Sequence, residues 1–185
     1  SADLEGLAAF VSVVEKDMQA LGFTVTRHPM AGRGDALECV YGDGEDTLLL
    51  IGHMDTVFAR EENQPFAVDG DRLTGSGVMD MKGGVLIMQA ALAEVLPTMP
   101  KRMRVVAILS ADEEIGSEGC SGVITKWTKQ AFACLSFEPM RPGNTLVRQR
   151  KGVTAFQIAC TGIRGHGGAN YLKCASAIQQ LCAVV

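Results

Sequence analysis

The sequence of 185 residues predicts an α/β fold with a mostly parallel sheet and helices on both of its faces. Two observations lead to this prediction. Apolar runs of strand length alternate with segments of helical spacing, an order typical of parallel sheets covered by helices. Histidine and acidic residues closely follow three of these runs, and open α/β sheets bind ligands just beyond the carboxyl ends of their strands.

The first predicted helix covers residues 3–21, because apolar side chains recur there at intervals of three and four residues. Gly22 follows it as a C-terminal cap, since glycine tolerates the left-handed backbone that such caps require. Two more helices are expected over residues 85–96 and 121–128, and prolines end the first of these two.

Five main strands are expected, over residues 23–27, 37–41, 47–51, 104–110 and 133–137. The last three are continuous apolar runs, which indicates strands that are buried on both faces. Residues 69–71 have the composition of a tight turn between two short strands.

The pattern changes near residue 151, so we expect two domains, residues 1–150 and residues 151–185. The second comprises a half-exposed strand, a glycine-rich loop and a helix, over residues 153–161, 162–170 and 175–185. We interpret this segment as the beginning of a smaller domain that is left incomplete.

The composition excludes several classes of function. The net charge of −4 and the lack of a Lys/Arg stripe argue against a nucleic-acid surface, and no apolar run is long enough to span a membrane. Six cysteines without a C-x-x-C pair indicate free thiols and a reducing compartment. We therefore expect a cytoplasmic protein. No signal peptide is visible, but the chain opens on Ser1 and not on Met, so a periplasmic or secreted protein whose native N-terminus is missing is the alternative.

His53 and Asp55 stand just after the apolar run 47–51. A neutral imidazole is a good zinc ligand, and a carboxylate on its other ring nitrogen fixes the tautomer. Residues two apart in an extended segment share a side, so Asp55 can approach the imidazole of His53. Taken alone, the pair is also consistent with an ordinary surface loop.

Three consecutive carboxylates, Asp112, Glu113 and Glu114, follow the run 104–110. Their mutual repulsion at the end of a buried strand is costly unless cations lie nearby. One glutamate can bind a metal ion while its neighbour acts as a base on a water whose pKa the metal lowers. A solvated acidic turn is the alternative interpretation.

Asp80 lies in a glycine-rich segment before a helix, and Glu138 ends the run 133–137. Taken alone, Asp80 is better explained as a helix N-cap, and Glu138 is either a ligand or a cap. Together with His53 and Glu114 they form a nitrogen and oxygen ligand set that suits zinc or cobalt. A pair of co-catalytic ions needs one carboxylate that bridges them.

Four motifs, in this order, resemble one zinc metallopeptidase family: Gly52–Val57, Gly77–Gly84, Asp112–Ser117 and Phe137–Pro139. That family includes glutamate carboxypeptidase (carboxypeptidase G2), acetylornithine deacetylase, succinyl-diaminopimelate desuccinylase and aminoacylase-1. The residues of the motif Phe137–Pro139 and those around Asp80 are most similar to the glutamate carboxypeptidase branch. The resemblance implies a zinc exopeptidase-like catalytic domain, followed by the start of a smaller α+β dimerisation domain.

The resemblance also implies a role for each metal ligand. His53 and Glu138 would be terminal ligands of one zinc ion, Asp80 would bridge two zinc ions, and Glu114 would bind the second. The family supplies a terminal histidine for the second ion from near its C-terminus. This chain contains two other histidines, and His28, before a proline, matches no motif and is expected on the surface.

The remaining roles that the resemblance implies are catalytic. Glu113 would be the general base and Asp55 would orient His53. His166, in the glycine-rich loop of the smaller domain, would reach across a dimer interface to help hold the substrate and stabilise the oxyanion. The resemblance therefore implies a homodimer with two Zn²⁺ per full-length subunit, with Co²⁺ or Mn²⁺ as alternatives.

The implied function is hydrolysis of an amide next to a free carboxylate, in a small peptide or N-acyl-amino-acid substrate. The first expectation is a carboxypeptidase that releases a C-terminal amino acid such as glutamate, and an N-acyl-amino-acid deacylase is the nearest alternative. A non-catalytic fragment, or a binding or dimerisation module that keeps the fold, is the alternative from another class. We expect the chain to be a fragment of such an enzyme, and the fragment alone to be inactive.

Overall fold

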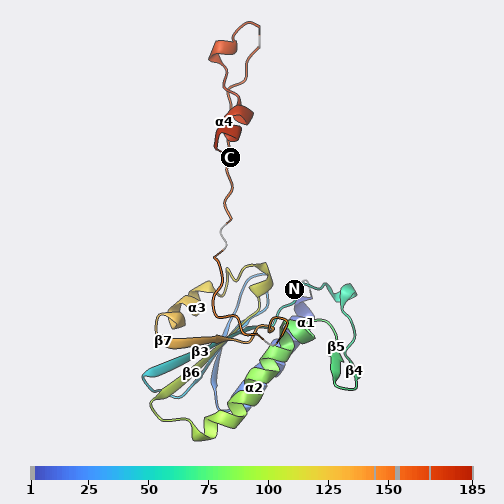
Figure 1. Cartoon of the computed structure of the whole chain (residues 1–185), viewed down its shortest axis with the longest axis vertical. Helices are drawn as coiled ribbons and strands as arrows, with labels where there is room; N and C mark the ends of the chain where they lie inside the picture. Colours follow the sequence, from blue (N-terminus) through green and yellow to red (C-terminus); the bar gives the residue numbers. More distant parts are fainter. Residues whose placement is uncertain (1–2, 144, 153–154, 167, 185) are drawn as a thin grey trace. The chain divides into compact units, whose positions relative to one another are not determined.

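The structure is a computed structural model in which residues 3–143, 145–152, 155–166 and 168–184 are described (Figure 1). It divides into two compact units, Ser1–Asn144 and Thr145–Val185. No helix of the described residues is long and apolar enough to cross a membrane.

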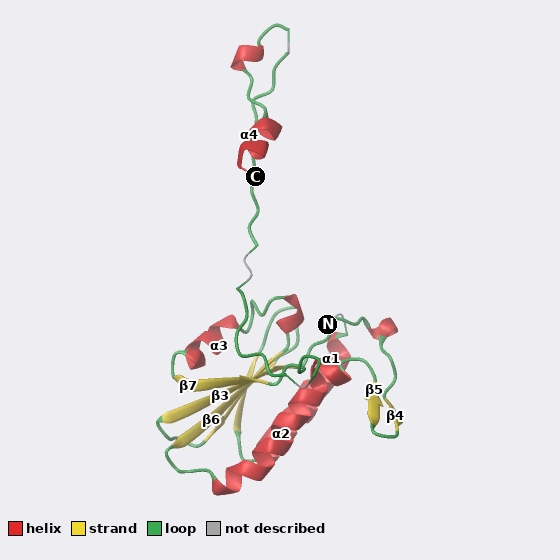
Figure 2. Ribbon diagram, in the orientation of Figure 1, coloured by secondary structure: helices red, strands yellow, loops and turns green. Residues whose placement is uncertain are grey.

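A five-stranded sheet in the order β1-β2-β6-β3-β7 forms the centre of the first unit (Figure 2). Its strands are β1 (Thr24–His28), β2 (Ala36–Tyr41), β3 (Asp46–His53), β6 (Met103–Ser110) and β7 (Ala131–Ser136). β3 pairs in parallel with both β6 and β7, whereas β1 and β2 add an antiparallel pair at the other edge. The carboxyl ends of the three parallel strands therefore meet at one edge of the sheet.

Helices cover both faces of this sheet, as the sequence predicts (Figure 2). α1 (Leu4–Ala20) and α2 (Gly83–Val95) pack on one face, and α3 (Ser121–Thr128) packs on the other. Strand β6 shows why its sequence is a continuous apolar run. Val105, Ala107 and Leu109 belong to the core under α1 and α2, whereas Val106 and Ile108 belong to the core under α3.

The expectation that three strands are buried on both faces is wrong for the third. β3 and β6 lie inside the sheet, but β7 is an edge strand that pairs only with β3. Phe132 and Leu135 on β7 are 65% and 50% exposed. An apolar run alone does not reveal whether a strand has neighbours on both sides, and within the described residues β7 has one.

A buried carboxylate joins α3 to the sheet. Glu38 on β2 is 7% exposed and accepts hydrogen bonds from Trp127 Nε1 at 2.6 Å and Lys126 Nζ at 2.8 Å. His28 Nε2 lies 2.7 Å from the other carboxylate oxygen, so the histidine expected on the surface is half-buried and contacts Glu38. Burial raises the pKa of Glu38, but these hydrogen bonds outweigh burial and hold its pKa below the ordinary value.

We expect Glu38→Gln to lower the free energy of unfolding at pH 7 by about 1–3 kcal/mol, because buried donors lose a charged acceptor. The folded pKa of Glu38 is depressed. Its stabilisation is therefore complete above the unfolded pKa of about 4.3 and is lost as the pH falls through the lower folded value. Urea unfolding of both proteins at pH 7 and pH 3 checks this, and the difference should shrink at pH 3.

The control for this prediction is Asp46→Asn, which removes an exposed ion pair with Arg102. An exposed pair contributes roughly 0–1 kcal/mol, so this variant should unfold like the unmodified protein at both pH values. An equal loss of stability in Glu38→Gln and Asp46→Asn would refute the conclusion that the buried carboxylate of Glu38 joins α3 to the sheet.

The smaller elements are a hairpin in the first unit and a helical segment in the second. β4 (Ala67–Asp69) and β5 (Arg72–Thr74) form the short hairpin that the sequence predicts. The second unit contains α4 (Ala177–Val184) and one isolated bridge between Ile163 and Ala175. The strand expected over 153–161 is not present in residues 155–161, which have no pairing partner, and residues 153–154 lie outside the described part.

Candidate metal centre

His53 is the central residue of the site and occupies the last position of β3. Its side chain is 1% exposed, and its backbone N–H donates to the sulfur of Met81 at 3.2 Å. Nδ1 lies 3.0 Å from the backbone carbonyl oxygen of Asp55, which can only accept, so Nδ1 carries the ring hydrogen. In the neutral ring, Nε2 is then the nitrogen with the lone pair that a metal ligand requires.

Asp55 serves a wider role than the sequence predicts. Its carboxylate lies 3.5 Å from His53 Nδ1, farther than its own carbonyl oxygen, so the carbonyl is the closer orienting group. The two carboxylate oxygens accept the backbone N–H groups of Glu113 at 3.2 Å and Glu114 at 3.1 Å. Burial raises the pKa of Asp55, but the His53 and Glu114 hydrogen bonds outweigh it and lower the pKa overall. Asp55 thus joins the His53 segment to the turn after β6.

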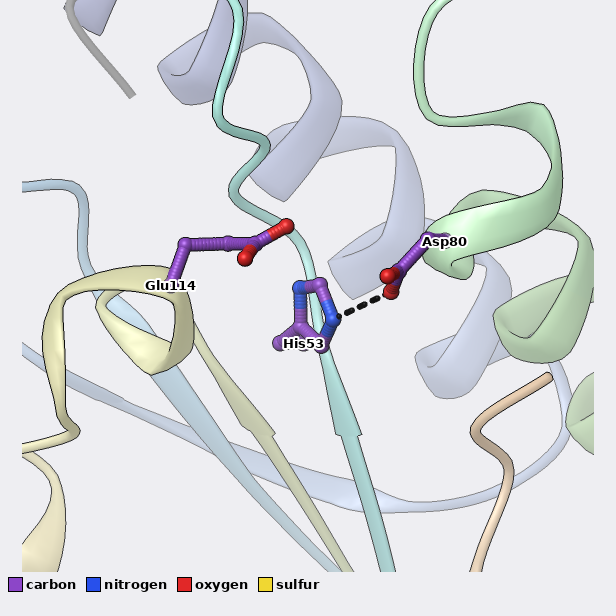
Figure 3. Close-up of side chains that lie close together, drawn as sticks. All are labelled: His53, Asp80 and Glu114. Atoms are coloured by element: carbon purple, nitrogen blue, oxygen red, sulfur yellow. Dashed lines mark hydrogen bonds and ion pairs between the residues drawn. The ribbon is translucent and has the colours of Figure 1, made fainter.

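Carboxylates from three other segments converge on Nε2 of His53. Asp80 Oδ1 lies 3.0 Å away, Glu138 Oε1 3.6 Å and Glu113 Oε2 4.0 Å. His53, Asp80 and Glu114 each offer one ligand atom within 4.8 Å of the other two. Figure 3 shows the carboxylates of Asp80 and Glu114 on opposite sides of the imidazole.

Glycines let these segments approach one another. Gly77 has a φ of 71° just before the turn Val78–Lys82 that carries Asp80, and this left-handed conformation favours glycine. A Cβ at Gly84 would collide with the backbone carbonyl oxygen of Phe137. The start of α2 can therefore lie against the end of the segment that carries Glu138.

The electrostatics of the cluster call for a cation. Within the described residues, no lysine or arginine forms a salt bridge with Asp80, Glu113, Glu114 or Glu138. Burial lowers the pKa of His53, but the Asp55 hydrogen bond and the surrounding carboxylates raise it to about 9. Burial, and then the charge of Asp80, raise the pKa of Glu114. A divalent cation would relieve the repulsion among these carboxylates, and one imidazole with several carboxylates fits zinc.

The sequence analysis expects cations near the three consecutive carboxylates, and for Asp112 the cation is an arginine of the same unit. The Asp112 side chain is fully buried and accepts from Arg33 Nη1 at 2.8 Å and from the backbone N–H of Gly119 at 2.7 Å. Only Glu113 and Glu114 of the acidic triplet point to the site. The sequence does not predict the role of Arg33, because a single arginine in a loop gives no sign that it pairs with Asp112, 79 residues away.

His166 belongs to the second unit, where its Nδ1 accepts the backbone N–H of Gly168 at 3.2 Å. Its side chain is exposed. The role of His166 at the catalytic centre stays a prediction.

Within the described residues, a buried imidazole faces several carboxylates that have no lysine or arginine partner, beside the carboxyl ends of parallel strands, and this arrangement defines a candidate metal-dependent hydrolase. Residues 49–171 match the model of peptidase family M20/M25/M40. The chain belongs to this family. The resemblance inferred from the four sequence motifs is therefore confirmed.

Two curated relatives illustrate the family. Carboxypeptidase G2 of Pseudomonas sp. (strain RS-16) is 36% identical over 174 residues, which cover 90% of this chain and 42% of that protein. A succinyl-diaminopimelate desuccinylase of Gluconobacter oxydans (strain 621H) is 30% identical over 164 residues, which cover 80% of this chain and 43% of that protein. The chain thus spans less than half the length of these relatives.

Solved structures confirm the α/β fold. Human carnosine dipeptidase 1 superimposes with a TM-score of 0.62 at 19% identity, covering 74% of this chain and 34% of that one. Aminopeptidase PepT from Bacillus cereus ATCC 10987 gives a TM-score of 0.61 at 18% identity, covering 93% of this chain and 48% of that one. At these identities the likeness concerns the fold alone.

Proposed function

We propose that the full-length protein is a dinuclear zinc hydrolase that cleaves an amide bond next to a free carboxylate. The observation that carries the proposal is the convergence of Asp80, Glu113 and Glu138 within 4.0 Å of Nε2 of His53. A carboxypeptidase that releases a C-terminal amino acid such as glutamate is the first candidate, supported by the similarity to carboxypeptidase G2.

The ligands divide between two ions. His53 and Glu138 would hold one zinc ion, Glu114 would hold the other, and Asp80 would be shared, since its carboxylate is near both His53 and Glu114. A bound metal ion supplies Lewis acidity, which lowers the pKa of a water molecule and polarises the amide carbonyl. Co²⁺ and Mn²⁺ are alternatives that the same donors accept.

Glu113 is the residue placed to move the proton. Its side chain is 47% exposed, so substrate and water can reach it, and the Asp55 carboxylate fixes its backbone N–H. As the water oxygen bonds to the carbonyl carbon, Glu113 takes its proton and passes it to the nitrogen of the leaving amine when the C–N bond breaks. The products are a carboxylic acid and a free amino acid.

An N-acyl-amino-acid deacylase is the second candidate. The similarity to a succinyl-diaminopimelate desuccinylase favours it. Such an enzyme would use the same centre and break the same kind of bond, and it would differ in the acyl group it accepts.

The remaining proposals concern the division into domains, the dimer and His166. We assign residues 1–150 to the catalytic domain and residues 151–185 to the beginning of a smaller domain through which two subunits form a homodimer. His166 of one subunit would then help bind the substrate of the other. No nucleic-acid or membrane partner is proposed, and the compartment proposed is the cytoplasm.

The test is hydrolysis by the full-length gene product. We expect release of glutamate from an N-acyl-glutamate or a dipeptide ending in glutamate, loss of this activity after dialysis against a chelator, and recovery with Zn²⁺. Substrates whose terminal carboxylate is converted to an amide should react slower by on the order of 10² or more, because the groups that bind the carboxylate would be left unpaired. Failure to release an amino acid from any of these substrates would refute the proposal.

A further inference from the structure

Two adjacent residues of one turn hold His53, one at its ring and the other at its backbone. Asp80 Oδ1 lies 3.0 Å from Nε2 of the imidazole, the contact drawn as a dashed line in Figure 3. The sulfur of Met81 accepts the backbone N–H of His53 at 3.2 Å. The carboxylate of Asp80 is 55% exposed at the centre, whereas the side chain of Met81 is completely buried. The turn therefore contacts His53 both inside and outside the candidate metal centre.

The sulfur of Met81 takes the place of a backbone partner that the sheet does not supply. Ile51, two residues before His53 and on the same side of β3, accepts the backbone N–H of Phe137. β7 ends at Ser136 and pairs with β3 only as far as Ile51. Within the described residues, no strand continues on that side to accept the N–H of His53. A buried N–H needs an acceptor, and the thioether of Met81 provides it.

Two glycines make room for the Met81 side chain. A Cβ at Gly52 or at Gly84 would lie 2.9 Å from the methyl carbon of Met81, closer than side-chain atoms pack. Gly52 directly precedes His53 on β3, and Gly84 belongs to the first turn of α2. The space between the strand and the helix thus fits a long, unbranched apolar side chain that carries an acceptor atom, and methionine has this combination.

We propose that Met81 is a positioning residue, whose sulfur fixes the backbone of His53 to the turn that carries Asp80 and thereby raises the affinity of the centre for zinc. This inference rests on the proposed function. A metal site binds more tightly when its ligands are held in place before the ion arrives. The contact between Nε2 and Asp80 cannot hold them in the loaded protein, because both groups would bind the ion. The contact between the sulfur and the backbone N–H uses neither ligand atom.

The first experiment compares Met81→Leu with Met88→Leu in the full-length protein. Met88 is the matched control, because it is also completely buried in the same core and, within the described residues, its sulfur accepts no hydrogen bond. Competition with a chromophoric chelator measures zinc affinity. We expect Met81→Leu to bind zinc about 10-fold more weakly, the low end of the effect of groups that support metal ligands. Met88→Leu should bind zinc as tightly as the unmodified protein.

The second experiment removes only the sulfur. Norleucine, incorporated in place of every methionine, keeps the shape of the side chain and replaces its sulfur by a methylene group. We expect this replacement to weaken zinc binding of the unmodified protein by about 10-fold and to cause no further loss in Met81→Leu. A further loss of the same size in Met81→Leu would overturn the proposal, because the effect would then come from other methionines.

Amide hydrogen exchange of the metal-free proteins tests the sulfur contact without zinc. The N–H of His53 should exchange with D₂O faster in Met81→Leu than in the unmodified protein, and at the unmodified rate in Met88→Leu. Unchanged exchange in Met81→Leu would overturn the proposal. Equal zinc affinity in Met81→Leu and Met88→Leu would overturn only the positioning role, whereas a full-length protein that binds no zinc would contradict the proposed function itself.

Discussion

Replacement of Glu113 by glutamine should abolish most of the hydrolysis and leave the metal content unchanged. Glutamine keeps the size of the side chain and the backbone N–H that Asp55 accepts, but it cannot take a proton from water. Positioned proton transfer contributes about 10²–10⁴-fold, so kcat should fall by that factor. Single-turnover kinetics and metal analysis of the same sample measure both quantities.

The control for this variant is Glu94→Gln, which removes a carboxylate from the exposed face of α2. It should retain full activity and full metal content. Loss of metal in Glu113→Gln in proportion to its loss of activity would mean that Glu113 is a ligand. Retention of activity would mean that another group moves the proton.

Replacement of Arg33 by leucine should cause the largest loss of stability. Asp112 is fully buried, and one of its carboxylate oxygens has no hydrogen-bond partner within the described structure even with Arg33 in place. Removing one partner of a buried ion pair costs about 3–5 kcal/mol, because the other charge stays buried without compensation. Urea denaturation of the full-length protein measures this loss.

Two further variants isolate the buried pair. Glu118→Gln removes the other, weaker contact of Arg33, at 3.4 Å with an 81% exposed partner, and should cost less than about 1 kcal/mol. Adding Asp112→Asn to Arg33→Leu removes the unpaired charge and should recover part of the stability. No recovery in this double variant would show that Arg33 stabilises by packing and not by charge.

The regular elements followed from local patterns in the sequence. α3 has the predicted bounds, and α1 ends within one residue of its prediction, because apolar spacing is a local property. The exposure of β7 could not be predicted, since an apolar run indicates a strand without revealing how many neighbours it has. The alternating residues 155–161 were predicted as a strand but form none, because a strand also needs a neighbouring strand to pair with.

Most of the site residues could be predicted from their positions near strand ends, but the hydrogen bonds that link them to distant parts of the chain could not. The approach of Glu138 to His53 follows the rule for parallel strands, whereas Asp80 reaches His53 from the turn before α2. The bond from the Asp55 carboxylate to the turn at Glu113, and the neutralisation of Asp112 by Arg33, join residues 58 and 79 positions apart. Such long-range hydrogen bonds leave no periodic signal in a single sequence.

The most direct test of the account is a zinc titration of the metal-free, full-length protein, measured by equilibrium dialysis with Asp80→Asn and Glu138→Gln as variants. We expect two zinc ions per subunit in the unmodified protein. Each variant should bind zinc more weakly by at least about 10- to 100-fold, the loss that follows even from removing a partner of a metal ligand. A protein that binds no zinc, or variants that bind it as tightly as the unmodified protein, would contradict the assignment of this centre.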